Sequence, residues 1–315
     1  MAEHVLTTDH IHRVWDHAIP PALKVDSGDE VTIATLDSSG HYYTAGSTAD
    51  DARRKPPFAG HPLTGPVYVE GARPGDVLQV DILSVQPGPL GYTAVYPGRA
   101  LLGSDFDEYH LVMWDLCTGD TAVFPANPDI RIPLAPFCGV MGVALAEPGR
   151  HSTMPPRRVG GNMDVKQLTA GSTLYLPIEV DGALFSCGDA HAAQGDGEVC
   201  ITAIECDAVS TFRLTLRRDL SIQETQARIS AQRPSALYLG PYHVTMAHAP
   251  DLYVASQRAV RYMLDWLGQT LGLGRADAYI LCSVAADLKI SQVVDAPNWT
   301  VSCFLPLGIL GTVQD

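Results

Sequence analysis

Two glycine-rich segments of the sequence carry the residues best suited to chemistry. Residues 160–164 read Gly-Gly-Asn-Met-Asp, and residues 188–198 read Gly-Asp-Ala-His-Ala-Ala-Gln-Gly-Asp-Gly-Glu. Glycine allows a loop to adopt positive φ and to approach an ion or a small ligand closely. The same composition is also typical of acidic turns that close β-hairpins. Carboxylates, an imidazole and two amides gathered in this way favour a metal-assisted hydrolytic site over plain turns.

A set of oxygen and imidazole ligands can be drawn from these segments. Asp189 and His191 are two residues apart, so in an extended segment their side chains point to the same side. Together with Asp164 they form the expected metal-binding set, which suits zinc better than calcium because an imidazole takes part. We expect Glu198, at the start of the next strand, to be brought back by a hairpin and to carry protons in catalysis. The ligand and proton-transfer roles of these carboxylates are interchangeable at this stage, since no regular spacing fixes them.

Other polar residues compete for a place in the site. Asn162 and Gln194 lie in the same two segments and are expected to bind the substrate. His61 begins the stiff sequence His-Pro-Leu-Thr-Gly-Pro, where it could contact a substrate or only brace its loop by a backbone hydrogen bond. His10 and His12 form a His-x-His pair near the start of the chain, which could ligate a metal but is expected at the surface.

Motifs for other kinds of catalysis are absent from the sequence. It has no Gly-x-Ser-x-Gly nucleophile elbow and no Gly-x-Gly-x-x-Gly or Walker motif for nucleotides. The seven cysteines are scattered without a Cys-x-x-Cys pair, so they are interpreted as reduced core thiols. A metal site built from carboxylates and imidazole is therefore the leading interpretation.

Length and composition indicate a folded globular protein. Of 315 residues, 46% are hydrophobic and 18% are charged, which supports a large core. A net charge of −14 without a basic patch argues against nucleic acid and anionic membranes as partners. No signal peptide and no apolar run of about eighteen residues is visible, so we expect a cytoplasmic protein.

The elements that must position the polar loops are mostly strands. Turn signals or alternating apolar residues mark five expected strands, at 31–36, 77–85, 173–180, 199–203 and 212–216. Such alternation is typical of half-buried strands in antiparallel sheets. We therefore predict a mainly β protein, with an antiparallel β-sandwich body over residues 1–217.

The character of the sequence changes beyond this body. Apolar residues at three- and four-residue spacing over 252–267 predict a helix that Asp251 caps and a glycine-rich segment ends. Residues 279–286 are expected to form a strand, and residues 287–294 alternate between polar and apolar side chains. A smaller α/β unit over residues 218–315 is predicted, packed on the body in one compact protomer with a soft boundary.

Six motifs in order resemble the acetamidase/formamidase family. They lie at 60–71, 160–164, 174–177, 182–185, 188–198 and 287–295. The sequence does not resemble the serine-dependent amidase-signature family, because it lacks the Gly/Ser-rich stretch that carries the nucleophile of that family. The resemblance spans residues 12–306, and it implies hydrolysis of small linear amides such as formamide and acetamide, a β-sandwich core, metal dependence and a homo-oligomer. We expect the oligomer to be a dimer or a dimer of dimers.

The resemblance also includes the loop of His61 together with both glycine-rich segments. We therefore expect His61 to approach Asp164, Asp189, His191 and Glu198 and to act in catalysis, as a donor that orients the substrate or as an additional metal ligand.

The expected activity is metal-dependent hydrolysis of the C–N bond of a small linear amide to a carboxylate and ammonia. An amide is a poor electrophile with a poor leaving group, so carbonyl polarisation and leaving-group protonation are both needed. One alternative is a non-catalytic protein that binds a small ligand and holds a structural metal, for example calcium. Another is a hydrolase of a carbamate or a cyclic amide.

Overall fold

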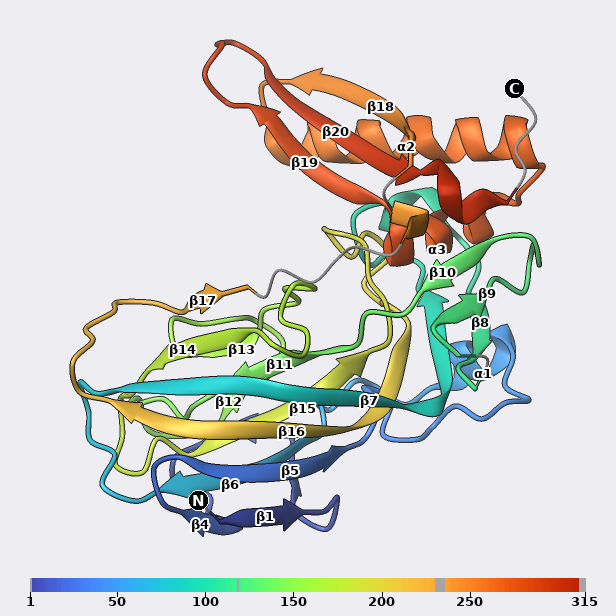
Figure 1. Ribbon diagram of the computed structural model, residues 1–315. Coiled ribbons are helices and arrows are strands. Elements are labelled where there is room, and N and C mark those ends of the chain that lie inside the picture. Colours follow the sequence, from blue (N-terminus) through green and yellow to red (C-terminus); the bar gives the residue numbers. More distant parts are fainter. Residues whose placement is uncertain (1, 118, 230–235, 239, 312–315) are drawn as a thin grey trace.

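A computed structural model describes residues 2–117, 119–229, 236–238 and 240–311. Strands are the most frequent regular structure of this chain (Figure 1). The strands of the body are β1 (Glu3–Leu6), β2 (Ile11–His12), β3 (Val14–Trp15), β4 (Leu23–Val25), β5 (Asp29–Thr35), β6 (Leu63–Val69), β7 (Val77–Val95), β8 (His110–Asp115), β9 (Thr121–Val123), β10 (Arg131–Pro133), β11 (Phe137–Gly142), β12 (His151–Ser152), β13 (Gly160–Asn162), β14 (Thr173–Pro177), β15 (Phe185–His191), β16 (Glu205–Arg217) and β17 (Gln226–Arg228). The body also contains α1 (Ala49–Arg54) and the 3₁₀ turn η1 (Gly103–Asp105). The predicted mainly β class is confirmed.

A thirteen-stranded sheet forms most of the body and folds into two layers that meet at one corner. In one layer β16 lies between β5 and β7, and β7 continues to β14. In the other layer β15 lies between β6 and β11, and β11 continues to β13. The layers join where Ala190 and His191 pair with Cys206 and Glu205. All these pairings are antiparallel, whereas β1 with β5 and β4 with β6 are parallel.

The buried faces of the strands explain why this sheet forms. Residues of β5 alternate between buried and half-buried, as expected for a strand that covers a core on one face. Phe185 of β15 and Phe212 of β16 are both fully buried, and their ring centroids lie 5.6 Å apart. Four of the five expected strands are present, and β7 extends ten residues beyond the predicted end, from Val85 to Val95. The alternation of the sequence therefore located the central strands correctly.

One expected strand, at residues 199–203, is wrong. This segment forms turns, and β16 begins only at Glu205. Glu198, which was expected to start a strand, has φ 41°, and Ile201 has φ 72°. These left-handed conformations cannot continue an extended ladder. The apolar side chains that gave the alternation, such as Val199, are buried in the common core instead.

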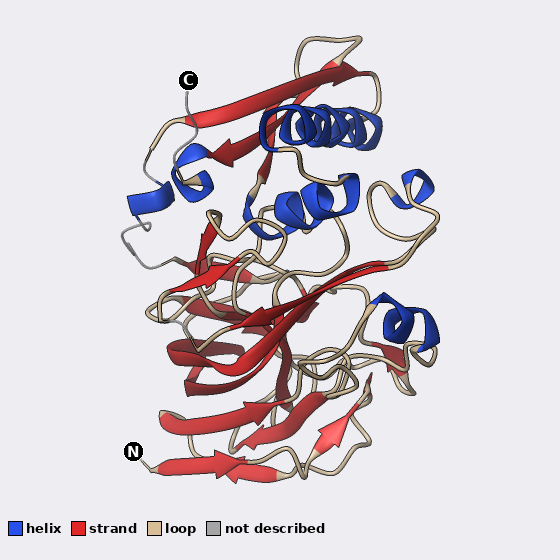
Figure 2. Cartoon of the chain, turned by 90° about the vertical axis from the view of Figure 1, so that its right-hand side faces the viewer, coloured by secondary structure: helices blue, strands red, loops and turns tan. Residues whose placement is uncertain are grey.

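The C-terminal part is a small unit of helices and strands. It comprises η2 (Ala236–Tyr238), β18 (Tyr242–Ala249), α2 (Leu252–Leu271), α3 (Arg275–Ala285), β19 (Asp287–Gln292), β20 (Trp299–Pro306) and η3 (Leu307–Leu310). The sheet has the order β18-β20-β19 and is antiparallel. Figure 2 shows the strands of the body stacked below the two long helices. The predicted C-terminal α/β unit is confirmed.

Helix α2 agrees with the sequence, and α3 does not. Asp251 caps α2 by accepting a hydrogen bond from the Val254 amide at 2.9 Å, and Gly272 ends the helix at φ 65°. Residues 279–286 were expected to form a strand, but they belong mostly to α3. Every side chain from Ala278 to Ala285 is buried. Because the helix is covered on all sides, its sequence carries no amphipathic period, and a short apolar run of this kind resembles a buried strand.

The C-terminal unit packs directly on the body. One hydrophobic core contains buried residues of both parts, for example Phe212 and Leu281. Arg261 of α2 donates two hydrogen bonds of 2.7 Å to the Asp105 carboxylate. The boundary after residue 217 stays a prediction. None of the helices among the described residues is long and apolar enough to cross a membrane.

Candidate active site

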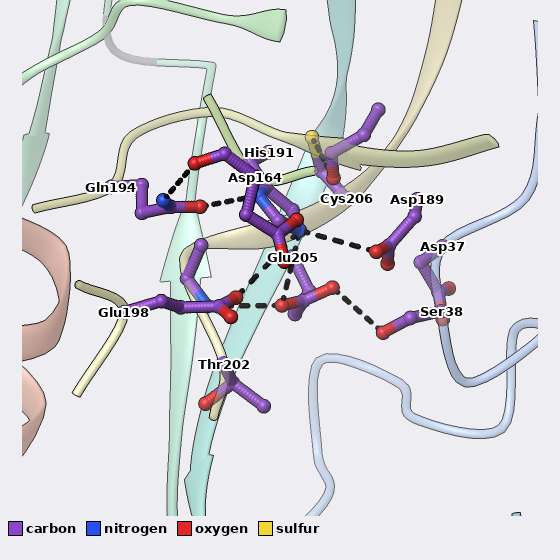
Figure 3. A network of polar contacts seen from close by, with 12 residues as sticks. Asp37, Ser38, Asp164, Asp189, His191, Gln194, Glu198, Thr202, Glu205 and Cys206 are labelled. Carbon is purple, nitrogen blue, oxygen red and sulfur yellow. Dashed lines mark hydrogen bonds and ion pairs between the residues drawn. The ribbon is translucent and has the colours of Figure 1, made fainter. Parts of the chain in front are cut away.

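The corner where the two layers join gathers acidic side chains around one imidazole. His191 ends β15, Glu205 begins β16, and the two residues are cross-strand partners. His191 Nε2 lies 3.4 Å from Glu205 Oε1, 3.7 Å from Asp189 Oδ2 and 4.0 Å from Glu198 Oε1 (Figure 3). Two adjoining strand ends and a loop therefore converge on a single nitrogen atom.

The predicted metal-binding set lies together in space. One ligand atom each of Asp164, Asp189 and His191 lies within 4.8 Å of the others. His191, Glu198 and Glu205 form a second such group. Asp164, Asp189 and Glu198 have φ values of 49°, 55° and 41°, and they are three of the eight non-glycine residues with positive φ in the described chain. Such strained backbone concentrates at functional sites, where the surrounding structure holds it.

Hydrogen bonds fix which nitrogen of His191 faces the carboxylates. The Gln194 amide nitrogen donates to the Asp164 carbonyl oxygen at 2.8 Å, so its Oε1 faces His191. His191 Nδ1 lies 2.9 Å from this oxygen and must therefore donate to it. Nε2 is left buried, with no hydrogen-bond partner in the described chain. Metal-ligating histidines have this arrangement, in which the distal N–H is bound by a second residue.

Unpartnered polar atoms concentrate at this corner. Six buried side-chain atoms of the described residues lack a hydrogen-bond partner, and four of them belong to His61, Asn162, Asp164 and His191. Buried polar groups normally have partners, because leaving one unsatisfied costs about 1–3 kcal/mol. The donor set of carboxylate oxygens and one imidazole therefore fits a divalent cation together with a polar ligand.

The electrostatics of the cluster favour the same conclusion. Burial raises the pKa of Asp164 to about 7. Burial and then the neighbouring Asp164 carboxylate raise the pKa of Glu198 well above its usual value. Burial alone would lower the pKa of His191, but the carboxylates of Glu205 and Asp189 raise it well above 6.5. The buried site has an excess of negative charge, which a divalent cation would offset.

A cavity of about 180 Å³ opens over these groups. His61, Asn162, Asp164, Asp189 and Glu198 are among the residues that line it. His61 Nε2 lies 3.6 Å from Asp189 Oδ2, so the predicted approach of its loop to the glycine-rich segments is confirmed. Gln194, by contrast, lies behind His191 with both amide atoms bonded within the protein.

Three residues of the site had no place in the expectations from the sequence. Glu205 Oε2 accepts a hydrogen bond from Ser38 Oγ at 2.7 Å, and Glu205 Oε1 accepts one from the Ala203 amide at 2.9 Å. The Ser38 hydroxyl also lies 2.6 Å from the Tyr92 hydroxyl. A carboxylate inside the apolar run 199–206 was a signal that could have found Glu205. No local pattern marks Ser38 or Tyr92, because only the pairing of distant strands brings them there.

A glycine also shapes the floor of the site, because it has no side chain. A Cβ atom on Gly139 of β11 would lie 2.5 Å from Asp164 Oδ1 and 2.9 Å from His191 Cε1. Real Cβ contacts are essentially never this short. Glycine at this position therefore lets two members of the predicted metal-binding set come together over the strand.

The C-terminal unit braces the loop that carries Glu198. The Gly195 amide donates to the Ser283 carbonyl at 2.8 Å, and the Cys200 amide donates to the Ser283 hydroxyl at 3.1 Å. The Tyr279 hydroxyl donates to the Val199 carbonyl and accepts from the Leu102 amide. Helix α3 thus holds this loop from behind.

The His-x-His pair lies apart from this site. His12 is half-buried rather than at the surface, and its Nδ1 donates to the Val14 carbonyl at 2.8 Å. The Ser186 hydroxyl therefore donates to His12 Nε2, at 2.9 Å. His12 and Ser186 are not among the residues that line the cavity. Their contact joins β2 to β15 within the body.

The fold and the site together define a class. The chain belongs to the Acetamidase/Formamidase family, whose model matches residues 2–150 and 144–312. A formamidase from Methylophilus methylotrophus is 27% identical to it over 95% of this chain and 89% of its own. An acetamidase from Mycolicibacterium smegmatis is 30% identical over 63% of this chain and 66% of its own.

Solved structures show the same likeness. A gamma lactamase from Delftia acidovorans is 26% identical, with a TM-score of 0.90 over 97% of this chain and 93% of its own. An acetamidase from Bacillus halodurans is 30% identical, with a TM-score of 0.68 over 96% of this chain and 97% of its own. The family resemblance of the motifs is confirmed.

Proposed function

We propose that this protein is a metal-dependent hydrolase that cleaves the C–N bond of small linear amides. The observation that carries the proposal is His191 Nε2, which is buried, unpartnered and surrounded by carboxylates while Nδ1 donates to Gln194. Membership of a family of amidases supports the reaction type.

Asp164, Asp189 and His191 would hold the ion, and the imidazole favours zinc over calcium. A divalent ion bound there supplies Lewis acidity that polarises a carbonyl and makes water more acidic. Gln194 orients His191. It is not among the residues that line the cavity, and both of its amide atoms are bonded within the protein, so we do not propose it as the substrate contact that the sequence suggested. Its role is to keep Nε2 directed at the ion.

The two glutamates are held differently, which separates their proposed roles. Both carboxylate oxygens of Glu205 accept hydrogen bonds, from Ser38 and from Ala203, so this carboxylate is fixed. The Glu198 carboxylate accepts none from the described residues, and Glu198 lines the cavity with 17% of its side chain exposed. A carboxylate with free oxygens can take a proton from water and pass it to the departing nitrogen. We therefore assign proton transfer to Glu198 and orientation of the cluster to Glu205.

His61 and Asn162 are the proposed contacts to the substrate. Both line the cavity, and His61 Nδ1 and Asn162 Oδ1 have no partner in the described chain. The Asn162 oxygen can accept from the amide NH₂ of a substrate, and His61 can donate to its oxygen. The cavity of about 180 Å³ is smaller than the roughly 300–1,000 Å³ typical of sites for drug-sized ligands, which favours small substrates.

The test is ammonia release from a panel of amides by the purified protein, with and without a chelator, together with its metal content. We expect hydrolysis of formamide or acetamide that chelation abolishes and that zinc restores. Turnover that survives complete removal of metal would contradict the metal-dependent mechanism. A protein that binds metal and hydrolyses no amide would instead be a binding protein. The dimer or dimer of dimers and the cytoplasmic location stay predictions.

Cyclic amides are a second candidate class of substrate. The observation in their favour is the TM-score of 0.90 with the gamma lactamase, compared with 0.68 for the acetamidase from Bacillus halodurans. Opening of a lactam cleaves the same C–N bond but releases no ammonia, because the amine stays attached to the product. The panel should therefore include a γ-lactam, followed by the appearance of a primary amine.

A further inference from the structure

Two cations line the cavity without an anionic partner. Lys55 follows α1, and Arg99 follows the turn after β7; both are among the lining residues. In the described part of the chain neither side chain has a hydrogen bond or a carboxylate within ion-pair distance. Arg53, a third cation on this wall, is paired with Glu108. Lys55 and Arg99 therefore keep their donors free.

Three tyrosine rings hold the ammonium group of Lys55. Its Nζ lies 5.2 Å from the ring centroid of Tyr43, 5.8 Å from that of Tyr92 and 5.9 Å from that of Tyr96. Contacts of this kind attract a cation through the faces of the rings. They leave the N–H donors without oxygen acceptors, and an ammonium carries three such donors. The protein thus positions the ammonium group of Lys55 but provides no hydrogen-bond acceptor for it among the described residues.

Lys55 is also connected to the acidic floor of the cavity. Tyr92, one of its three rings, contacts Ser38, which donates to Glu205. Burial lowers the pKa of Lys55, and the charge of Glu205 opposes this shift. If Lys55 only neutralised the carboxylates, it would be expected to form an ion pair with one of them. No carboxylate among the described residues lies within 4.0 Å of it.

The cavity is therefore lined by both signs of charge. Carboxylates of the predicted site line it, and so do two cations with free donors. Formamide and acetamide have a single acceptor oxygen, which the proposed function places at the metal end, and they carry no second acceptor for those donors. A carboxylate is the group that matches them, because it accepts hydrogen bonds from an ammonium and a guanidinium together.

We propose that the natural substrate is a short amide that also carries a carboxylate, and that Lys55 and Arg99 bind this carboxylate while the amide carbonyl lies at the metal end. The proposal rests on the proposed function, because it names the substrate class of the same site. The small cavity limits the substrate to a few carbon atoms between the two groups. Succinamate is a suitable probe, and butyramide is a neutral amide of the same chain length.

The first experiment compares these two amides on the metal-loaded, full-length protein. We expect kcat/KM for succinamate to exceed that for butyramide by at least about tenfold, which corresponds to about 1.4 kcal/mol. Lys55→Met and Arg99→Met should each lower this preference severalfold, and Lys55→Arg should recover part of it. Lys24→Met is the matched control, because Lys24 lies 5.1 Å from the centroid of the Tyr68 ring and does not line the cavity. It should leave the preference unchanged.

A wild-type protein that hydrolyses butyramide as well as succinamate would overturn the proposal and leave the amidase function standing. If neither amide is hydrolysed, the panel with formamide and acetamide decides about the proposed function, and calorimetric titration of succinate into the metal-loaded protein decides about the cationic wall. Binding that weakens at least about tenfold in Lys55→Met would support it. Absent binding, or equal binding by both proteins, would overturn it.

Discussion

The candidate site is built from two kinds of backbone that are held in different ways. His191 and Glu205 lie at paired ends of β15 and β16, where the ladder of the large sheet fixes them. Asp164 and Glu198 lie in loops with positive φ, outside any strand. The strand half is fixed by this ladder, whereas the loop of Glu198 is bonded to α3 through Ser283.

This difference matches the roles that we propose for His191 and Glu198. An ion needs ligands that stay in place, and the strand end provides one in His191, while Asp164 brings another proposed ligand from a loop. Proton transfer needs a carboxylate that can exchange partners, which a loop at the edge of a cavity allows. The fixed Glu205 and the unbonded Glu198 illustrate the contrast within one residue type.

The largest expected effect comes from breaking the strand half. His191→Ala should lower the affinity for metal by more than about a hundredfold, beyond the 10–100-fold effect typical of residues that only orient a ligand. Amide hydrolysis should fall to background. Metal content and ammonia release measure the two effects, and circular dichroism reports whether the fold persists. His248→Ala, an exposed histidine of β18, is the control and should change neither. Full metal occupancy in His191→Ala would remove His191 from the ligand set.

A smaller and more selective effect is expected in the loop half. Glu198→Gln should lower kcat by about 10²–10⁴-fold, the usual contribution of a general acid or base, and should keep the metal bound. Glu205→Gln is the variant to compare with it, because it replaces the carboxylate that hydrogen bonds hold in place. The proposed roles would have to be exchanged if Glu198→Gln lost the metal and Glu205→Gln lost only turnover.

The smallest effect should come from loosening the brace behind the loop. Tyr279→Phe removes the hydroxyl that bonds Val199 and Leu102. The buried Leu102 amide is then left without a partner among the described residues, whereas the Val199 carbonyl still accepts from the Leu101 amide at 3.2 Å. We expect a loss of about 1–3 kcal/mol in the free energy of unfolding. Turnover should fall severalfold with metal affinity unchanged, because the strand half stays intact. Urea denaturation and metal titration are the measurements, with Tyr253→Phe, an exposed residue, as control. An equal loss of metal affinity would show that the two halves are not independent.

The sequence predicted the parts of the fold that have a clear period. Strands such as β5 and the helix α2 bury one face, so apolar residues recur at two-residue or at three- and four-residue spacing. Helix α3 is buried on every side, and the segment 199–203 is buried without pairing to a strand. Neither has a period that reports its conformation, and both were assigned wrongly.

The site could be predicted in part for a similar reason. Asp164, Asp189 and His191 lie in conspicuous glycine-rich segments, so their residue types alone suggested a metal site. His61 was placed nearby through the family resemblance. Lys55 follows the short helix α1 and Ser38 lies in a turn after β5, and only the folded protein brings them to the cavity. The side of the cavity that we propose selects the substrate therefore lay outside what the sequence could predict.

The pairing of β7 with β16 governs when the site can exist during synthesis. Val80 of β7 pairs with Leu214 of β16, so the long edge of β7 stays open while the ribosome makes all the residues between them. Open strand edges are templates for aggregation, and such distant pairings form slowly. The same strand that finally covers this edge also delivers Glu205 to His191. A nascent chain that stops short of β16 would therefore be prone to aggregate and would lack Glu205. The same pairing event closes the open edge of β7 and completes the site.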